Sequence, residues 1–201
     1  MSPQMSPIIL STAYFPPINY FHFFTTDHPI YLEHYEYYMR HSFRNRAMIN
    51  GSNNNFLITV PIKGGNSSKT LIKDIRIANE NWKRNHIKSI QSSYGSAPFF
   101  IYYFSDIKKL INNQHVFLID LNNDILEYFL NEFKIEKKVK KTTLYTKSYP
   151  DVISNQRHKI KVKRLYKKYQ QVFNQHFTAN LSVLDLIFNL GPNASEYISE
   201  S

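Results

Sequence analysis

The sequence predicts an α/β fold in which a mixed β-sheet is flanked by helices, starting with a βαβ unit. Short apolar runs of strand length alternate with longer amphipathic stretches, and the first 35 or so residues read as strand, helix, strand. The chain has 201 residues, 42% hydrophobic and 20% charged, which is an ordinary balance for one globular domain with a buried core. We therefore expect residues 1–201 to form a single domain.

The N-terminal residues supply the βαβ unit. Pro7 to Ala13, PIILSTA, is a short apolar run bounded by proline, which is typical of a buried strand. An aromatic helix is expected over Ile18 to Thr26, with Pro17 near its start, and a second strand from Ile30. Two strands joined in this way are expected to lie parallel, with a right-handed crossover.

The middle of the chain predicts further strands and a broken helix. Phe56 to Ile62, FLITVPI, follows the turn NGSNNN and is the strongest strand signal, and Leu71 to Ile77 alternates as a strand does. A helix begins near Asn81, and Ala97-Pro98 breaks it before PFFIYYFSDIKKLINNQ continues helical.

The last third begins with VFLID, which reads as strand-like or as a lead-in to a helix over Asp124 to Phe133. RHKIKVKRLYKKY, from Arg157 to Tyr169, alternates with period two and favours a strand with an exposed lysine face. LSVLDLIFNLG is a helix that ends at Gly191-Pro192.

The net charge of +10 is concentrated in one segment. Residues 134–168 hold 13 of the 25 Lys and Arg but only two of the 15 acids, so the rest of the chain is near neutral. This disfavours a whole-domain nucleic-acid binder. The segment itself leaves three readings open: a solvated sheet edge, attraction to an anionic membrane surface or substrate, or nucleic-acid binding.

Several classes of site are excluded or not expected. The absence of cysteine rules out disulfides, thiolate zinc sites and a cysteine nucleophile. No metal-ligand spacing stands out among the eight histidines, so we expect no metal and no cofactor. The chain has no apolar run of about 18 residues and no secretory signal at its start, so we expect a cytoplasmic protein.

Four stretches together resemble the WbqC-like family of bacterial proteins, which is associated with surface-polysaccharide (O-antigen type) biosynthesis. In order, they read STAYFPPINYF, YLEHYEYYMRHSFRNRAMI, NWKRNHIKSIQSSYGSAPFF and YQQVFNQHFTANLSVLDLIFNLGPNA, and they span residues 8–194. The chain looks like a short form, because longer relatives carry a further α/β segment where it has only the basic stretch 137–168. Ser11-Thr12 also stands where the family usually has Gln-Pro.

Candidate site residues follow from the motifs and from the rule that ligands bind at the carboxyl ends of strands in α/β sheets. We expect one crevice to hold the substrate-binding residues Tyr14, Glu33, Arg44, Asn45 and Arg46. We expect His86 or Glu36 to act as the catalytic acid or base. The alternative to a catalytic role for His86 is that it is a packed, hydrogen-bonded residue close to Trp82.

The arginines have two readings that the sequence leaves open. Arg44 and Arg46 would share a face if the segment is extended, and their guanidinium groups match a phosphate or carboxylate. The other reading pairs them internally with Glu33 and Glu36. These glutamates are three residues apart, so only Glu36 is expected to face the crevice.

The resemblance implies a role in surface-glycan biosynthesis, as a transferase of an acyl, aminoacyl or glycosyl group. The expected partner is a sugar nucleotide or a sugar-linked intermediate. One alternative is a non-catalytic ligand-binding or scaffold protein of the same pathway, and a further alternative is a nucleic-acid-binding domain. The transferred group and the oligomeric state stay open.

Overall fold

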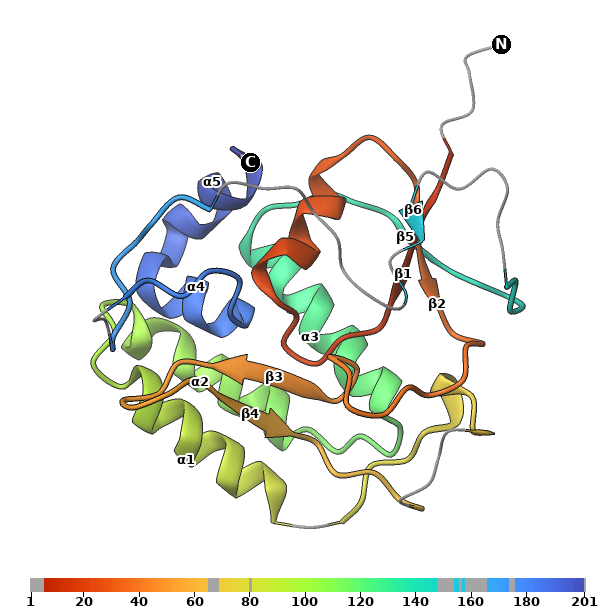
Figure 1. Cartoon of the computed structure of the whole chain (residues 1–201), viewed down its shortest axis with the longest axis horizontal. Helices are drawn as coiled ribbons and strands as arrows, with labels where there is room; N and C mark the ends of the chain where they lie inside the picture. Colours follow the sequence, from red (N-terminus) through yellow and green to blue (C-terminus); the bar gives the residue numbers. More distant parts are fainter. Residues whose placement is uncertain are drawn as a thin grey trace.

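The computed structural model describes residues 6–64, 69–79, 81–147, 154–155, 157, 166–173 and 176–200. A parallel sheet lies at one end of the molecule, most helices lie at the other, and α3 runs between them (Figure 1). The elements are, in chain order, β1 (Ile8–Ser11), η1 (Ile18–Thr25), β2 (Ile30–Glu33), β3 (Arg46–Ile49), β4 (Phe56–Thr59), η3 (Ile72–Asp74), α1 (Trp82–Tyr94), α2 (Phe100–Asn112), α3 (Leu118–Glu132), β5 (Val139–Lys141), β6 (Ser154–Asn155), α4 (Val183–Leu190), η4 (Gly191–Asn193) and α5 (Ala194–Ser199).

The four-stranded sheet has the order β5-β2-β1-β6, and every neighbouring pair in it is parallel. All four residues of β1 are buried, as expected of a central strand covered on both faces. The connection from β1 to β2 confirms the predicted strand–helix–strand unit, with η1 as a 3₁₀ helix. Its three-residue period puts Ile18, Phe21 and Phe24 on one buried side.

The second sheet is an antiparallel hairpin of β3 and β4, in which Arg46 lies opposite Thr59. β4 is the strand predicted from FLITVPI, whereas β3 is a strand that the sequence motif did not single out. Ala47 and Ile49 of β3 are buried, while Met48 between them is exposed. Parallel and antiparallel strands are thus both present, as the α/β prediction requires, but they occupy two sheets.

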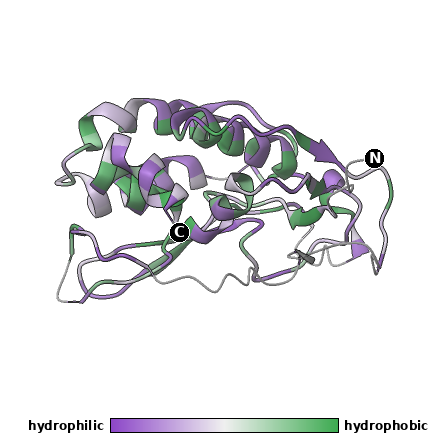
Figure 2. Ribbon diagram, turned by 90° about the horizontal axis from the view of Figure 1, so that it is seen from above, coloured by the Kyte–Doolittle hydropathy of each residue, from purple (hydrophilic) through white to green (hydrophobic). Residues whose placement is uncertain are grey.

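The helices follow the predicted pattern with one correction. α1 and α2 are separated at Ala97-Pro98, as expected. VFLID is not a strand: α3 begins at Leu118 rather than at Asp124. Leu118, Leu121 and Ile125 recur at helical spacing and are all buried, which explains the earlier start. Hydrophilic and hydrophobic residues alternate along the helical ribbons (Figure 2).

Two other strand predictions have different outcomes. Leu71 to Ile77 does not form a strand; it contains the 3₁₀ turn η3 and makes only isolated bridges, such as Tyr37 with Leu71. Two of its apolar side chains, Ile72 and Ile75, are nevertheless buried, and their three-residue spacing suits a 3₁₀ turn. The strand predicted within Arg157 to Tyr169 falls mostly outside the described residues.

α4 ends at Gly191 as predicted, and its first turn is capped by the Ser182 hydroxyl, which accepts from the Leu184 amide. In the described part of the chain, no helix combines the length and the apolar character that crossing a membrane requires. The single-domain organisation stays a prediction.

Candidate functional site

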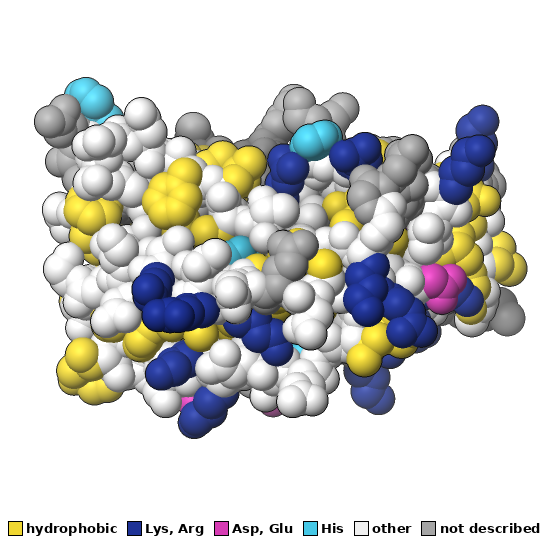
Figure 3. Space-filling model, turned by 90° about the horizontal axis from the view of Figure 1, so that it is seen from below, with side chains coloured by type: hydrophobic (Ala, Val, Ile, Leu, Met, Phe, Trp, Pro, Cys, Tyr) yellow, Lys and Arg dark blue, Asp and Glu magenta, His cyan; other side chains and the backbone are white. Residues whose placement is uncertain are grey.

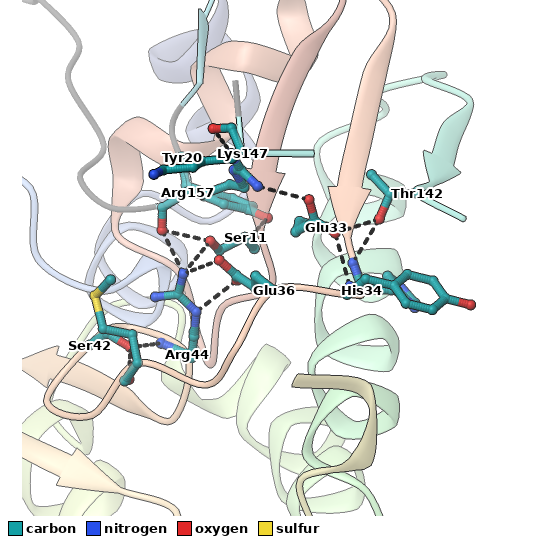
Figure 4. A network of polar contacts seen from close by, with 12 residues as sticks. Ser11, Tyr20, Glu33, His34, Glu36, Ser42, Arg44, Thr142, Lys147 and Arg157 are labelled. Atoms are coloured by element: carbon teal, nitrogen blue, oxygen red, sulfur yellow. Dashed lines mark hydrogen bonds and ion pairs between the residues drawn. The ribbon is translucent and has the colours of Figure 1, made fainter. Parts of the chain in front are cut away.

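Arg44 is fully buried, and its charge is neutralised by a glutamate of the same chain (Figure 4). Its Nε donates to Glu36 Oε1 (2.8 Å) and its Nη2 to Glu36 Oε2 (2.6 Å), a bidentate ion pair. Nη2 also lies 2.6 Å from the Ser11 hydroxyl and 2.6 Å from the Arg157 carbonyl oxygen. Of the two alternatives for Arg44, the geometry therefore agrees with internal pairing to a glutamate.

Glu33 lies in the same network but is paired with a different arginine. It has no exposed surface, and its Oε2 accepts from Arg157 Nη1 at 3.1 Å. Its Oε1 accepts from the Thr142 hydroxyl (2.7 Å) and the Tyr35 amide (2.9 Å). The expectation that only Glu36 would face inward is wrong, because β2 ends at Glu33 and strand alternation does not continue to Glu36.

This network occupies the carboxyl ends of β1 and β2. Ser11 is the last residue of β1 and Glu33 the last of β2. The Ser11 hydroxyl donates to the Arg157 carbonyl at 2.7 Å, which brings residue 157 onto the same sheet end. Two buried ion pairs thus hold together the edge at which ligands bind in many α/β proteins.

Tyr14 and His86 form a second buried pair. The Tyr14 hydroxyl lies 2.9 Å from His86 Nδ1, and His86 Nε2 lies 3.1 Å from the Thr59 carbonyl oxygen. A carbonyl only accepts, so Nε2 carries the proton and Nδ1 accepts from Tyr14. Burial lowers the pKa of His86 to about 4, so the ring is neutral at pH 7. Both ring nitrogens are engaged inside the protein.

Asn45 and Arg46 behave differently from Arg44. The side-chain amide of Asn45 donates from Nδ2 to the Val60 backbone carbonyl at 2.8 Å. The Val60 backbone amide donates to the Asn45 backbone carbonyl at 2.8 Å, so the two contacts connect the two ends of the hairpin. Arg46 is the first residue of β3 and is half-buried. Its Nε is buried, yet it has no hydrogen-bond partner among the described residues.

Arg44 and Arg46 therefore do not share one face. Arg44 lies in a turn before β3, and the extended backbone begins only at Arg46. The turn directs the Arg44 side chain to the end of the parallel sheet, while Arg46 follows the hairpin. The sequence motif holds two arginines with separate environments.

Arg46 lines a cavity of about 150 Å³ between the hairpin and the final motif. Its wall combines apolar side chains, such as Met48 and Leu57, with several polar ones. The polar side chains are His41, Ser42, Arg46, Asn180 and Ser182. Of these, the sequence reasoning identified only Arg46.

Three non-glycine residues with left-handed backbone line this cavity. They are Phe15 with φ 36°, His41 with φ 56° and Asn180 with φ 57°. Such conformations cost on the order of 1–3 kcal/mol each and gather at ligand sites more often than elsewhere. Asn tolerates positive φ, so Asn180 carried a weak sequence signal, whereas Phe15 carried none.

The final motif builds a polar cluster beside this region. Asp185 is fully buried, and its Oδ2 accepts from the Tyr169 hydroxyl (2.6 Å) and the Gln171 amide (2.8 Å). Burial raises the pKa of Asp185 to about 6, although these hydrogen bonds lower it. Asn189, at i+4, donates to the Asp185 backbone carbonyl rather than to its carboxylate.

The described residues contain no group of three or more His, Asp or Glu side chains that could hold a metal ion. The chemistry that the site offers is recognition of an anion by a guanidinium group, next to neutral hydrogen-bonding groups and apolar side chains.

Comparison with protein families gives a match over most of the chain. The model described as the WbqC-like protein family matches residues 12–155 and 149–197. The two matched segments overlap at residues 149–155, within the basic stretch 137–168. No curated protein and no solved structure gives a significant match.

Proposed function

Because the chain belongs to the WbqC-like protein family, we propose that it acts in bacterial surface-glycan biosynthesis and binds the anionic group of a sugar derivative at Arg46. Membership in this family fits a protein associated with polysaccharide biosynthesis. The ligand is a sugar nucleotide or a sugar-linked intermediate with a phosphate or carboxylate group.

The proposal rests on one observation: Arg46 Nε is buried in the wall of a cavity without a partner among the described residues. Leaving a buried donor unsatisfied costs about 1–3 kcal/mol, and more for a charged group. A phosphate or carboxylate oxygen at this position removes that cost and supplies the opposite charge. His41 and Asn180, which also line the cavity, add further hydrogen-bonding groups.

The size of the cavity limits what it can hold. A volume of about 150 Å³ is below the roughly 300–1,000 Å³ of complete small-molecule sites, so one charged group fits and a whole sugar nucleotide does not. Met48 and Leu57 lie opposite each other in the hairpin and are 39% and 46% exposed. They offer an apolar surface on which the rest of the ligand can pack.

Binding is tested by titrating the purified protein with a panel of nucleotide sugars, using calorimetry and thermal shift. We expect Arg46→Gln to weaken binding roughly 10- to 100-fold, because charge-assisted hydrogen bonds contribute about 1.5–3 kcal/mol. Arg40→Gln is the matched control, since Arg40 is exposed and does not line the cavity. Equal binding by wild type and Arg46→Gln, or equal losses in both variants, contradicts the proposal.

In the transferase form of this proposal, His86 or Glu36 removes a proton from the acceptor. The acceptor oxygen or nitrogen then bonds to the transferred acyl, aminoacyl or glycosyl group, and the carrier leaves with the bonding electrons. His86 would have to release Tyr14 or Thr59 to do so, and Glu36 would have to release Arg44. A transferase requires one of these internal contacts to open.

The same internal contacts favour the second candidate, a non-catalytic ligand-binding protein of the pathway. The two candidates are distinguished by mass spectrometry of donor and acceptor mixtures incubated with the protein. Turnover that disappears in His86→Gln or Glu36→Gln while nucleotide-sugar binding persists supports the transferase. Binding with no turnover by the wild type supports the binding protein.

A further inference from the structure

A groove of about 900 Å³ lies between the C-terminal half of α3 and the edge strand β5. In Figure 1 the chain leaves α3 and crosses over to β5, which places the groove at the sheet end of the molecule. It shares no lining residue with the Arg46 cavity. Its volume lies within the range of complete small-molecule sites.

The lining of this groove is amphipathic. Its apolar part comes from three elements and the turn between them, and consists of Leu32, Leu126, Leu130, Ile135 and Val139. The three leucines are buried and form the floor of the groove, while Ile135 and Val139 are half-buried and supply most of the apolar surface that an occupant would meet. Burying such a surface contributes about 25 cal/mol per Å².

Lysines surround this apolar surface. Lys134, Lys138 and Lys141 line the groove and are exposed, and their ammonium groups make no hydrogen bond or ion pair with the described part of the chain. Lys137 differs, because its ammonium group donates to the Thr26 carbonyl and so anchors the segment. The lining also holds Glu127 and Glu136, which leaves an excess of two positive charges: four lysines against two glutamates.

We propose that this groove binds a lipid phosphate, with its phosphate among Lys134, Lys138 and Lys141 and its alkyl chain on the apolar surface. Neither feature alone specifies this ligand. The apolar surface alone suits any hydrophobic molecule and the lysines alone suit any anion, but the combination selects an anionic amphiphile. The site goes beyond the proposed function and does not depend on Arg46.

The fold offers a matched control surface. A second groove of about 530 Å³ between α1 and α2 is lined by Lys83, Arg84, Lys88 and Lys108, with no acidic residue among its lining. α1 lies lowest in Figure 1, and the face seen from below carries many Lys and Arg side chains and few acidic ones (Figure 3). That groove has the charge but only one apolar side chain, Ile87.

The test uses dodecyl phosphate, kept monomeric, and measures binding to the full chain by calorimetry. We expect one site per chain, and neither inorganic phosphate nor uncharged dodecyl maltoside should occupy it. Changing Lys134, Lys138 and Lys141 together to Gln should weaken binding about 100-fold, on the order of fivefold per lysine. Changing Arg84, Lys88 and Lys108 to Gln should leave it unchanged.

Two further measurements keep the proposal falsifiable. Val139→Thr keeps the side-chain shape but makes the apolar surface polar, and should weaken dodecyl phosphate binding severalfold with circular dichroism unchanged. Vesicles with and without an anionic phospholipid form the second arm. Equal binding of inorganic phosphate, equal losses in both triple variants, or binding to anionic vesicles without binding of monomeric dodecyl phosphate overturns the proposal. Each of these results leaves the Arg46 titration unaffected.

Discussion

At the scale of single residues, two arginines that are two positions apart in the sequence lie in different environments. Arg44 is bidentate with Glu36 and has no exposed surface, and only its Nη1 lacks a partner among the described residues. Arg46 instead lines a cavity, and its Nε lacks a partner among the same residues. A buried ion pair in a low-dielectric environment stabilises only relative to its broken form, because each charge alone would be costly. Arg44 is therefore committed to an internal ion pair, and Arg46 is the arginine for which we propose anion binding.

This difference predicts a strong energetic coupling between Arg44 and Glu36. Arg44→Met and Glu36→Leu should each lower the free energy of unfolding by about 3–5 kcal/mol, because each leaves a buried charge without its partner. The double variant should lose much less than the sum of the two. Urea denaturation of the four proteins measures this directly.

Arg40→Met supplies the control for that cycle. Arg40 lies in the same segment but is exposed, so its replacement should change the free energy of unfolding by no more than about 0.5 kcal/mol. Losses that simply add in the double variant would show that the two side chains are not coupled.

At the scale of elements, the end of α4 is decided by one glycine. Gly191 has φ 54° and ψ −127°, a backbone conformation that residues other than glycine rarely adopt. A Cβ at this position would lie 2.4 Å from the Phe99 ring. The Phe99 amide also donates to the Phe188 carbonyl, so α4 and the start of α2 are in direct contact here.

Gly191→Ala should therefore lower the free energy of unfolding by about 2–5 kcal/mol, from backbone strain and overpacking together. Thermal and urea unfolding measure the loss. Adding Phe99→Ala should remove the overpacking part, so the pair should lose less than the sum of the single variants. A loss below about 0.5 kcal/mol in Gly191→Ala would mean that the turn relaxes without cost.

At the scale of the whole molecule, distant segments meet at a few buried polar contacts. Arg157 joins the ends of β1 and β2, and Ser182 near the C-terminus donates to the Phe15 carbonyl at 3.0 Å. Asp185 in α4 and His86 in α1 are both buried and are not paired with each other. Their pKa values are displaced in opposite senses, which makes the pH dependence of folding a property of the whole chain.

Because the two pKa values are displaced in opposite senses, acidification changes the free energy of unfolding in opposite directions at the two residues. The pKa of His86 falls from 6.5 unfolded to about 4 folded, so its contribution is full above pH 6.5 and is lost as the pH falls to 4. The pKa of Asp185 rises from 3.8 unfolded to about 6 folded, so stability increases as the pH falls through 6. Each effect is about 3 kcal/mol over its full window, and in the wild type they largely cancel.

Single variants should separate the two effects. When the pH falls from about 7 to about 4.5, the free energy of unfolding of His86→Gln should rise by about 2–3 kcal/mol relative to that of the wild type. That of Asp185→Asn should fall by about 2 kcal/mol relative to the wild type. Denaturation in urea at both pH values gives the four differences. The interpretation fails if either variant keeps the pH dependence of the wild type.

The sequence by itself determined the α/β class, the opening strand–helix–strand unit, the break at Ala97-Pro98, the end of α4 and the family. The structural features among these follow from local chemistry, because proline and glycine act on their own backbone and apolar periodicity reports which face of an element is buried. The family was recognised from four motifs taken together. VFLID was misread in part because a short apolar run has no periodicity that separates a buried strand from the first turn of a helix.

Only the tertiary structure decided what surrounds each arginine. The Arg44 partners come from residues 11, 36 and 157, and the Arg46 cavity is completed by residues 15 and 180, all fixed by the packing of separate elements. Pairing of charges depends on distances of a few ångströms through space, and sequence spacing reports such distances only within one regular element. The motif therefore located both arginines, but their different surroundings follow from the fold.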